Sequence, residues 1–341
     1  MLAVGTTAGA AEKEALRALR HVRRLIHAAQ IPDGALRVGA DPKSDRVWVV
    51  PYFAHWACVW LLESEAVDAD PGKLACVRRW LAWSCRHQES DGTIRDYKGK
   101  LSGYKRTERA DSTDAYAATF LMVARRQLAL RPKDPIRADL ARAARKALSA
   151  IELTWDGDGL TWARPDYKVK YLMDNIEVNW GLQDGAMLFD ALGDTASAGR
   201  CRKLRKASSR GLAVFRPKAE GPFAFALHES GKLDGGLDKW YPHGMANLYA
   251  LAAFKDAPRP LWLKAQRRFP KELRSVPALW LLAAHRCGDA QAAARYRAAV
   301  VQLAQGMSLS THRLDQLAHA LGALVCDRAS LPLIPLPPTA P

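Results

Sequence analysis

Two kinds of helix alternate along the chain, and this alternation constrains the fold more than any other feature. In the first kind, apolar residues recur every three or four positions, which predicts an amphipathic helix with one buried face; examples are 12–29, 73–88, 136–153 and 290–305. In the second kind, apolar residues cover all sides, which predicts burial on all sides. These segments are 51–64, 114–130, 176–192, 245–254, 276–287 and 314–326. We therefore expect an outer layer of helices around an inner layer.

The connections between these helices alternate too. A long polar loop with a glycine turn precedes each of the first four inner helices, whereas the returns from inner to outer helix are short. The loop glycines Gly34, Gly92, Gly159 and Gly221 are 58, 67 and 62 residues apart. Six helical hairpins of about 57 residues would fill the chain. The sequence therefore predicts an all-α ring of six hairpins with its long loops at one end.

This pattern, with stretches such as YLMDNIEVNWGLQDGAMLFDALGD, resembles the six-hairpin glycosidase superfamily over roughly 12–326. The resemblance implies an (α/α)6 toroid, formed as one domain over 12–328. We expect a signal remnant or a disordered N-terminus over 1–11 and a Pro-rich tail over 329–341, acting as a strap or as a disordered end. Polysaccharide lyases, sugar epimerases and terpene cyclases also use such toroids, so the fold alone does not assign the chemistry.

Four carboxylates stand where two inner helices begin. The pairs Asp111/Asp114 and Asp174/Glu177 have the D-x-x-D and D-x-x-E spacing. Glycosidic cleavage needs one carboxylic acid to protonate the leaving oxygen and one carboxylate to activate water or attack the sugar. We take these four as candidate catalytic residues. The same spacing is typical of helix N-caps, so at least one member of each pair is open to a capping role.

Other polar and aromatic residues are expected around the same cleft. Glu177, Gly181 and Asp184 fall on one stripe of a helix, where the glycine would leave room for a ligand; the alternative is that Asp184 pairs with a buried arginine or caps a backbone group deep in the toroid. Aromatic faces stack on sugar rings, although they stack on prenyl chains as well. The candidate substrate-binding residues are Tyr52, Arg109, Asn175, Trp180, Asp184, Trp240, Tyr241 and His243.

The charge balance favours an acidic partner. The chain has 51 Lys and Arg against 35 Asp and Glu, a formal charge of +16, although a basic solvated surface would give the same balance. Basic residues gather in the second and third loops, from Lys98 to Arg109 and from Arg164 to Lys170. Another cluster, from Arg200 to Lys218, is interpreted as the solvated face of an outer helix. No nucleic-acid motif accompanies them, and we expect an anionic carbohydrate substrate.

Several classes of protein are excluded or left open. An apolar content of 49% is that of a folded protein, and no apolar run reaches the roughly 18–20 residues that a membrane span needs. The six cysteines lack metal-ligand spacing, and no metal or cofactor is expected. Compartment and oligomeric state stay open: cytoplasmic, or periplasmic or secreted if a signal sequence was removed.

Three enzymatic interpretations and one non-enzymatic interpretation follow. The preferred one is a glycoside hydrolase that uses the carboxylate pairs. A lyase or uronate epimerase would instead use Tyr241 or His243 as base, with Asn175 and Arg109 stabilising the anion. DSTDAYA at 111–117 is similar to the D-x-D-D-T-A motif of class II terpene cyclases, but Thr113 replaces the proton-donating Asp. A non-catalytic sugar-binding toroid is the fourth.

Overall fold

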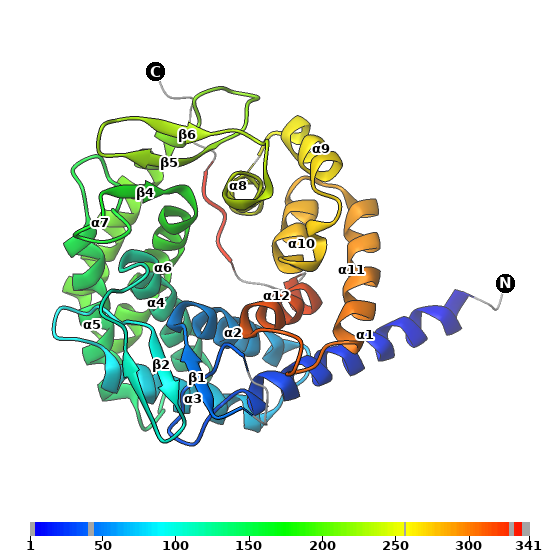
Figure 1. Ribbon diagram of the computed structural model, residues 1–341, viewed down its shortest axis with the longest axis horizontal. Coiled ribbons are helices and arrows are strands. Elements are labelled where there is room, and N and C mark those ends of the chain that lie inside the picture. Colours follow the sequence, from blue (N-terminus) through cyan, green and yellow to red (C-terminus); the bar gives the residue numbers. More distant parts are fainter. Residues whose placement is uncertain (1–3, 40–43, 256, 327–330, 336–341) are drawn as a thin grey trace.

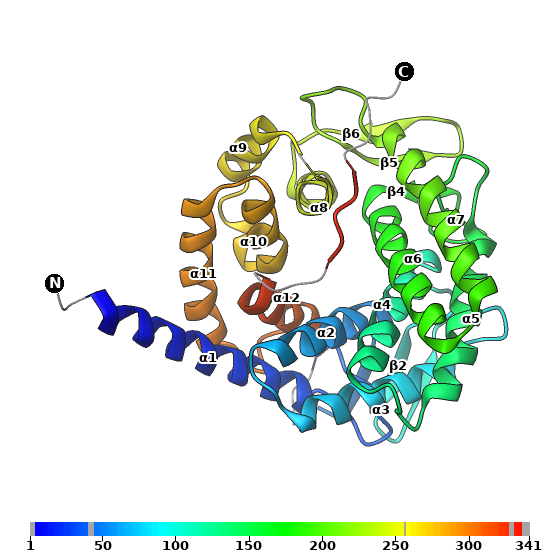
Figure 2. The same ribbon diagram turned by 180° about the vertical axis from the view of Figure 1, so that it is seen from behind.

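The computed structural model describes residues 4–39, 44–255, 257–326 and 331–335, and these form a closed ring of paired helices. Figure 1 looks down the ring axis, and Figure 2 shows the ring from behind. The six inner helices are α2 (Pro51–Glu63), α4 (Asp114–Leu130), α6 (Leu172–Leu192), α8 (Met245–Ala253), α10 (Pro277–Arg286) and α12 (Leu314–Val325). The six outer helices are α1 (Val4–Ala28), α3 (Pro71–His87), α5 (Arg137–Thr154), α7 (Thr195–Gly211), α9 (Arg259–Arg268) and α11 (Ala290–Gln305). The predicted (α/α)6 toroid is therefore confirmed.

The ring closes where the last hairpin meets the first. Inner helix α12 packs against α2, and outer helix α1 packs against α11 and α12. At one close contact a Cβ atom on Gly322 would lie 2.6 Å from the Trp60 ring, so only glycine fits there. Helix α1 begins at Val4 rather than near residue 12 and extends beyond the ring past α11 (Figure 1). A signal remnant over 1–11 stays a prediction.

Short strands lie at the end of the ring at which the inner helices begin. They form two antiparallel sheets, ordered β1-β2-β3 and β4-β5-β6. The strands are β1 (Arg46–Val49), β2 (Tyr97–Lys100), β3 (Gly103–Arg106), β4 (Val169–Tyr171), β5 (Ala224–His228) and β6 (Leu233–Gly235). All six belong to the long loops before α2, α4, α6 and α8, so the long loops gather at one end as the sequence predicts.

Three glycine turns of the repeat anchor these loops to the next outer helix. Gly34, Gly92 and Gly159 have positive φ angles of 104°, 91° and 88°. A Cβ atom at these positions would lie within 2.6 Å of a backbone oxygen, which belongs to α3, α5 and α7 respectively. The turns therefore need glycine both for conformation and for space. Gly221 lies beside the Lys218 side chain instead, so the repeat covers three loops rather than four.

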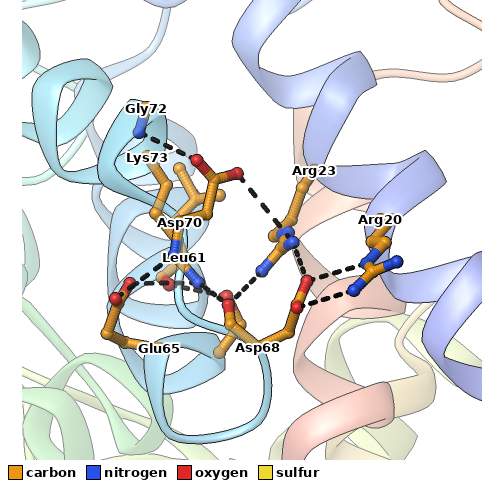
Figure 3. Close-up of polar contacts among 9 residues, drawn as sticks. Arg20, Arg23, Leu61, Glu65, Asp68, Asp70, Gly72 and Lys73 are labelled. Carbon is orange, nitrogen blue, oxygen red and sulfur yellow. Dashed lines mark hydrogen bonds and ion pairs between the residues drawn. The ribbon is translucent and has the colours of Figure 1, made fainter.

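An ion cluster ties α1 to the turn between α2 and α3 at the opposite end (Figure 3). The Asp68 carboxylate accepts from Arg20, at 3.0 Å, and from the buried Arg23. The fully buried Lys73 donates to the Asp68 carbonyl at 2.5 Å and pairs with Glu65 at 3.0 Å. The cluster thus links the first outer helix to the first hairpin turn.

The C-terminal residues 331–335 form a strap between α6 and α8, drawn in red in Figures 1 and 2. Ile334 is fully buried, and its backbone pairs with Ala253 and Lys255 at the end of α8. The indole of Trp180 on α6 donates to the Pro332 carbonyl at 2.9 Å. A strap was one of the two expected roles of the tail; the rest of 329–341 lies outside the described residues.

Within the described ranges, no helix is long and apolar enough to cross a membrane.

Candidate active site

The four predicted carboxylates come together where α4 and α6 begin. Asp114 is the first residue of α4, and Asp174 and Glu177 lie in the first two turns of α6. The two helices approach closely, because a Cβ atom on Gly181 would lie 2.6 Å from the backbone of Ala118. Gly181 therefore serves helix packing. The sequence-based expectation that it leaves room for a ligand was wrong.

Asp114 is a fully buried carboxylate with hydrogen bonds to both oxygens. Its Oδ1 accepts from Ser112 Oγ at 2.6 Å and from the Ala115 N–H at 2.8 Å, and its Oδ2 accepts from Thr161 Oγ1 at 2.7 Å. Burial raises the pKa of Asp114 to about 6, although the hydroxyl donors oppose this shift. With no exposed surface, Asp114 holds the start of α4 and the Thr161 loop in place.

Glu177 lies beneath the mouth of the ring and is also fully buried. Three donors share its Oε1: Tyr52 Oη at 2.5 Å, Tyr249 Oη at 3.0 Å and Trp56 Nε1 at 3.1 Å. Oε2 has no hydrogen-bond partner among the described residues. Burial raises the pKa of Glu177 to about 8 against the effect of these donors, so the carboxyl holds a proton at neutral pH.

Asp174 and Asp111 are the carboxylates that solvent reaches: Asp174 is half-buried and Asp111 is exposed. Burial, followed by the charges of Asp114, Glu177 and Asp111, raises the pKa of Asp174 well above its ordinary value. The Ser112 hydroxyl bridges Asp114 and Asp174, at 3.5 Å from Asp174 Oδ2. The N-cap of α6 is Tyr171 and that of α4 is Thr113, so neither accessible carboxylate occupies a cap position.

Tyrosines surround these two carboxylates. Tyr52 is half-buried, and its ring stacks on Tyr116 with centroids 5.9 Å apart. Tyr241 is 66% exposed on the rim, where burial of its hydroxyl and the charges of Asp174 and Asp111 raise its pKa. The predicted residues Tyr52 and Tyr241 therefore lie at the carboxylate cluster.

A fifth carboxylate was missed by the sequence analysis. Asp96 accepts from Tyr116 Oη at 2.9 Å and lies within hydrogen-bonding reach of the Trp48 indole. Burial and the charge of Asp111 raise the pKa of Asp96 to about 6. Asp96 precedes a strand rather than a helix, so no helical spacing marked it. Tyr249 and Trp56, the donors to Glu177, were missed because they stand within apolar helical runs.

The other predicted substrate-binding residues have mainly structural contacts. Asn175 is fully buried and holds the Thr161 backbone through its amide. Trp240 stacks on Trp280 at 6.1 Å, and His243 stacks on Phe225 at 4.8 Å with Nδ1 2.5 Å from Asp238 Oδ1. Arg109 is exposed in the loop before α4.

Asp184 and Trp180 lie in the core rather than at the ring mouth. Asp184 is 1% exposed and pairs with Arg126, which is also buried, and with Arg125 at 2.9 Å. These pairs match the alternative interpretation of Asp184 as the partner of a buried arginine. Trp180 is fully buried against the C-terminal strap. Asp184 faces α4 and Trp180 faces the strap, and both lie deeper along α6 than Glu177.

The described residues contain no group of three or more His, Cys, Asp or Glu side chains placed to hold a metal ion. The cluster consists of carboxyl, hydroxyl and indole groups. Such an arrangement supports proton transfer, because several carboxyl groups with raised pKa values lie next to an exposed carboxylate.

Comparisons with known proteins support the fold. No protein-family model and no curated protein sequence matches the chain. Several solved structures match the chain. One is an alpha-amylase from Clostridium perfringens, which matches with a TM-score of 0.60 at 10% identity, covering 90% of this chain and 97% of that one. An alpha-1,6-mannanase of Salegentibacter sp. in complex with alpha-1,6-mannotriose matches with a TM-score of 0.54 at 9% identity, covering 94% and 99%.

A third neighbour is a rhamnosidase from Klebsiella oxytoca with rhamnose bound. Its TM-score is 0.53 at 14% identity, and the match covers 91% of this chain and 63% of that one. These neighbours are glycosidases built on helical toroids, and at such identities the likeness shows that this chain shares their fold.

Proposed function

We propose that the protein is a glycoside hydrolase whose reaction takes place at Asp174 and Asp111. The observation that carries this proposal is the half-buried Asp174, held among three other carboxyl groups that raise its pKa, next to the exposed carboxylate of Asp111. Glycosidic cleavage needs two carboxyl groups, one as acid and one as base or nucleophile, and Asp174 and Asp111 are the two of the four predicted carboxylates that solvent reaches. The glycosidase neighbours and the shared toroid support it.

Each carboxylate has a definite task in this mechanism. Asp174 gives its proton to the glycosidic oxygen as the bond from that oxygen to the anomeric carbon breaks. Asp111, as the carboxylate, takes a proton from the water that attacks the anomeric carbon, or attacks that carbon itself before water releases the sugar. Asp114 and Glu177 are positioning residues, because neither has an exposed atom with which to contact a substrate.

The electrostatics of the site favour hydrolysis over β-elimination. An elimination base must lose its proton readily, yet the pKa values of Tyr52, Tyr171 and Tyr241 are all raised. Burial and neighbouring carboxylates cause these shifts, so a phenolate here is unfavourable. His243, the other predicted base, is stacked on Phe225 beside Asp238. We therefore propose a hydrolase, acting on an oligo- or polysaccharide that carries anionic groups.

The test is a hydrolysis assay with two readouts on acidic and neutral polysaccharides. New reducing ends report cleavage, and ultraviolet absorbance reports the unsaturated uronates that elimination would leave. We expect reducing ends without that absorbance, and a loss of about 10²- to 10⁴-fold in kcat for Asp174→Asn and for Asp111→Asn. Asp139→Asn, at an exposed carboxylate of outer helix α5, is the matched control and should keep full activity.

Two results would contradict the proposal. The first is near-wild-type hydrolysis by both site variants, which would remove Asp174 and Asp111 from the reaction. The second is a rise in ultraviolet absorbance together with the reducing ends, which would make the enzyme a lyase. Far-UV circular dichroism of each variant checks that the toroid is intact.

A further inference from the structure

The outward face of the β1-β2-β3 sheet is strongly basic around one tryptophan. The register places Trp48 opposite Lys98, and Lys98 opposite Lys105, so all three side chains stand on the same face. Arg46 stands opposite Lys100 on that face. We call these five residues the basic platform. All five are exposed, whereas Val47 and Val49 between them are buried.

A surface cavity of about 750 Å³ lies over the platform. Its lining includes Arg46, Trp48, Lys98 and Lys100 on one side and the segment 309–313 before α12 on the other. The Arg313 guanidinium lies 5.7 Å from the Trp48 ring centroid, and the Lys98 ammonium lies 5.0 Å from it. The volume is in the range of sites that take a small ligand.

Cations outnumber carboxylates around this cavity. The platform contributes four cations and Arg313 a fifth, whereas among the described residues the pairing carboxylates are Asp45, with Lys100, and Asp315, with Arg313. Two basic residues of the neighbouring loops are paired with carboxylates: Lys170 is buried between Asp156 and Asp158, and Arg106 pairs with Glu89. The platform therefore carries an excess of positive charge.

Trp48 connects the platform to the carboxylate cluster. Its indole lies within reach of Asp96, which accepts from Tyr116, and the Tyr116 ring stacks on Tyr52. Trp48 is 37% exposed, so part of its ring is available for stacking. Tyr52 in turn donates to Glu177, so a series of contacts links the platform to the carboxylate cluster.

We propose that the basic platform is a subsite for an anionic sugar unit of the substrate, remote from the bond that is cleaved. The Trp48 ring stacks on the sugar, and Arg46, Lys98 and Arg313 bind its carboxylate or sulfate group. This inference rests on the proposed function and gives it a substrate class: an acidic oligo- or polysaccharide at least several units long. Lys105 and Lys100 extend the positive field along the sheet.

An acidic polysaccharide fits this surface better than a nucleic acid does. The platform offers one exposed aromatic ring, whereas single-stranded nucleic acid is bound by a series of rings on which successive bases stack. The adjoining carboxylates Asp96 and Asp111 would repel a continuous run of phosphates. Sugar polymers carry their charges on the rings and have neutral linkages, so an uncharged glycosidic bond can lie at the carboxylates while a charged group lies at the platform.

Binding is measured in the Asp174→Asn background, so that no probe is consumed. The probes are polygalacturonate, which is carboxylated, dextran sulfate, neutral dextran and a single-stranded RNA, each followed by affinity electrophoresis and calorimetry. The double variant Arg46→Gln/Lys98→Gln removes two platform charges, and Trp48→Ala removes the stacking ring. The matched control is Lys203→Gln/Lys206→Gln, which removes two exposed charges from outer helix α7.

We expect an acidic polysaccharide to bind and neutral dextran not to. The platform double variant should raise the Kd by about tenfold or more, because it removes two charged hydrogen-bond donors to the anionic group. Added salt should weaken wild-type binding more than that of the platform variant, and the control should stay within about twofold of wild type. A preference for polygalacturonate identifies a carboxylate, and a preference for dextran sulfate identifies a sulfate; either supports the subsite.

Affinity unchanged by both platform variants overturns the inference, as does RNA binding as tight as that of the acidic polysaccharides. Failure of the proposed function gives a different result: platform-dependent binding with no cleavage of any substrate by the active protein. Cleavage of a neutral polysaccharide with no binding of acidic ones would keep the hydrolase and remove the subsite.

Discussion

Glu177 is the residue at which burial and hydrogen bonding conflict most directly. Three donors on Oε1 favour the ionised carboxylate, yet complete burial disfavours the charge and raises the pKa of Glu177 to about 8. An unfolded chain would ionise this group near pH 4.5. Between pH 4.5 and pH 8 the folded protein binds the Glu177 proton more tightly than the unfolded chain does. The contribution of Glu177 to stability is therefore largest below about pH 4.5 and is lost as the pH rises through 8.

Glu177→Gln should remove this part of the pH dependence. The amide keeps the shape of the protonated acid and cannot ionise, so the variant should lose less stability than wild type between pH 5 and pH 9. Urea unfolding at both pH values measures the difference, with Asp139→Asn as a control that should follow wild type. An equal loss of stability in wild type and Glu177→Gln would show that Glu177 is not protonated in the folded protein.

The sequence marks candidate site residues where polar groups stand at the start of an apolar helix or interrupt it. Asp174 and Glu177 stood out in this way, and the structure places them together with Asp111 and Asp114. Asp184 stood out equally, but it pairs with Arg125 and Arg126 deeper along the same helix. Helical spacing gives the face and the depth of a residue on its own helix but not its partner on another helix, so the sequence alone left both interpretations of Asp184 open.

The contact between α4 and α6 is the element-level feature that sets the geometry of the site. A Cβ atom on Gly181 would lie 2.6 Å from Ala118 Cα, closer than two such atoms can come. Gly181→Ala should therefore push the helices apart and lower the free energy of unfolding by about 1–3 kcal/mol. It should also lower activity, because Asp114 and Asp174 stand on the separated helices.

Gly199 on outer helix α7 supplies the control for that substitution. A Cβ atom there would meet nothing within 4 Å. Gly199→Ala should stabilise the protein by up to about 1 kcal/mol, since alanine is the better helix former. Guanidinium unfolding measures the free energy of unfolding of both variants and of wild type. A Gly181→Ala protein as stable as wild type would mean that α4 and α6 do not pack as described.

The turn between α2 and α3 depends on Asp68. Hydrogen bonds from Arg20 and Arg23 lower the pKa of Asp68 to about 2 despite partial burial. Asp68 therefore contributes stability at pH values above its unfolded pKa of about 3.8, and this contribution is lost as the pH falls through about 2. Asp68→Asn should destabilise the protein by about 1–3 kcal/mol at pH 7, because the buried Arg23 loses its carboxylate.

Thermal unfolding of wild type and Asp68→Asn at pH 7 and pH 3 checks the Asp68 prediction. The difference between the two proteins should be smaller at pH 3, where protonation has begun to remove the wild-type advantage. If wild type and Asp68→Asn differ in stability by the same amount at pH 7 and pH 3, the contribution of Asp68 does not come from its charge, which contradicts the prediction. Asp190→Asn, at an exposed ion pair with Arg202, should change stability by less than about 1 kcal/mol.

At the scale of the whole molecule, the alternation of amphipathic and buried helices was enough to predict a ring of six hairpins. Helical periodicity has physical causes that act within a few residues, and it therefore survives in a single sequence. The position of the strap was not predictable, because the tail around Leu331 and Ile334 has no periodicity and its partners on α6 and α8 are distant in sequence. Asp96 was missed because it also lies outside any helical periodicity, in the loop before β2.

The ring also explains why the charged groups of the site can be buried so deeply. Six inner helices begin at the mouth, and their side chains remove water from Glu177 and Asp114 while Asp174 stays at the boundary. The long loops before α2 and α4 carry the basic platform. We infer that the molecule separates two tasks: proton transfer at the carboxylates, and substrate binding on the sheet.

The most direct test of this account is a crystal structure of Asp174→Asn with an acidic oligosaccharide that the wild-type protein cleaves. We predict a glycosidic oxygen within about 2.6–3.2 Å of the side chain at position 174, with the Asp111 carboxylate beside the anomeric carbon. A sugar lying elsewhere, with its glycosidic bonds beyond the reach of positions 174 and 111, would contradict the central claim.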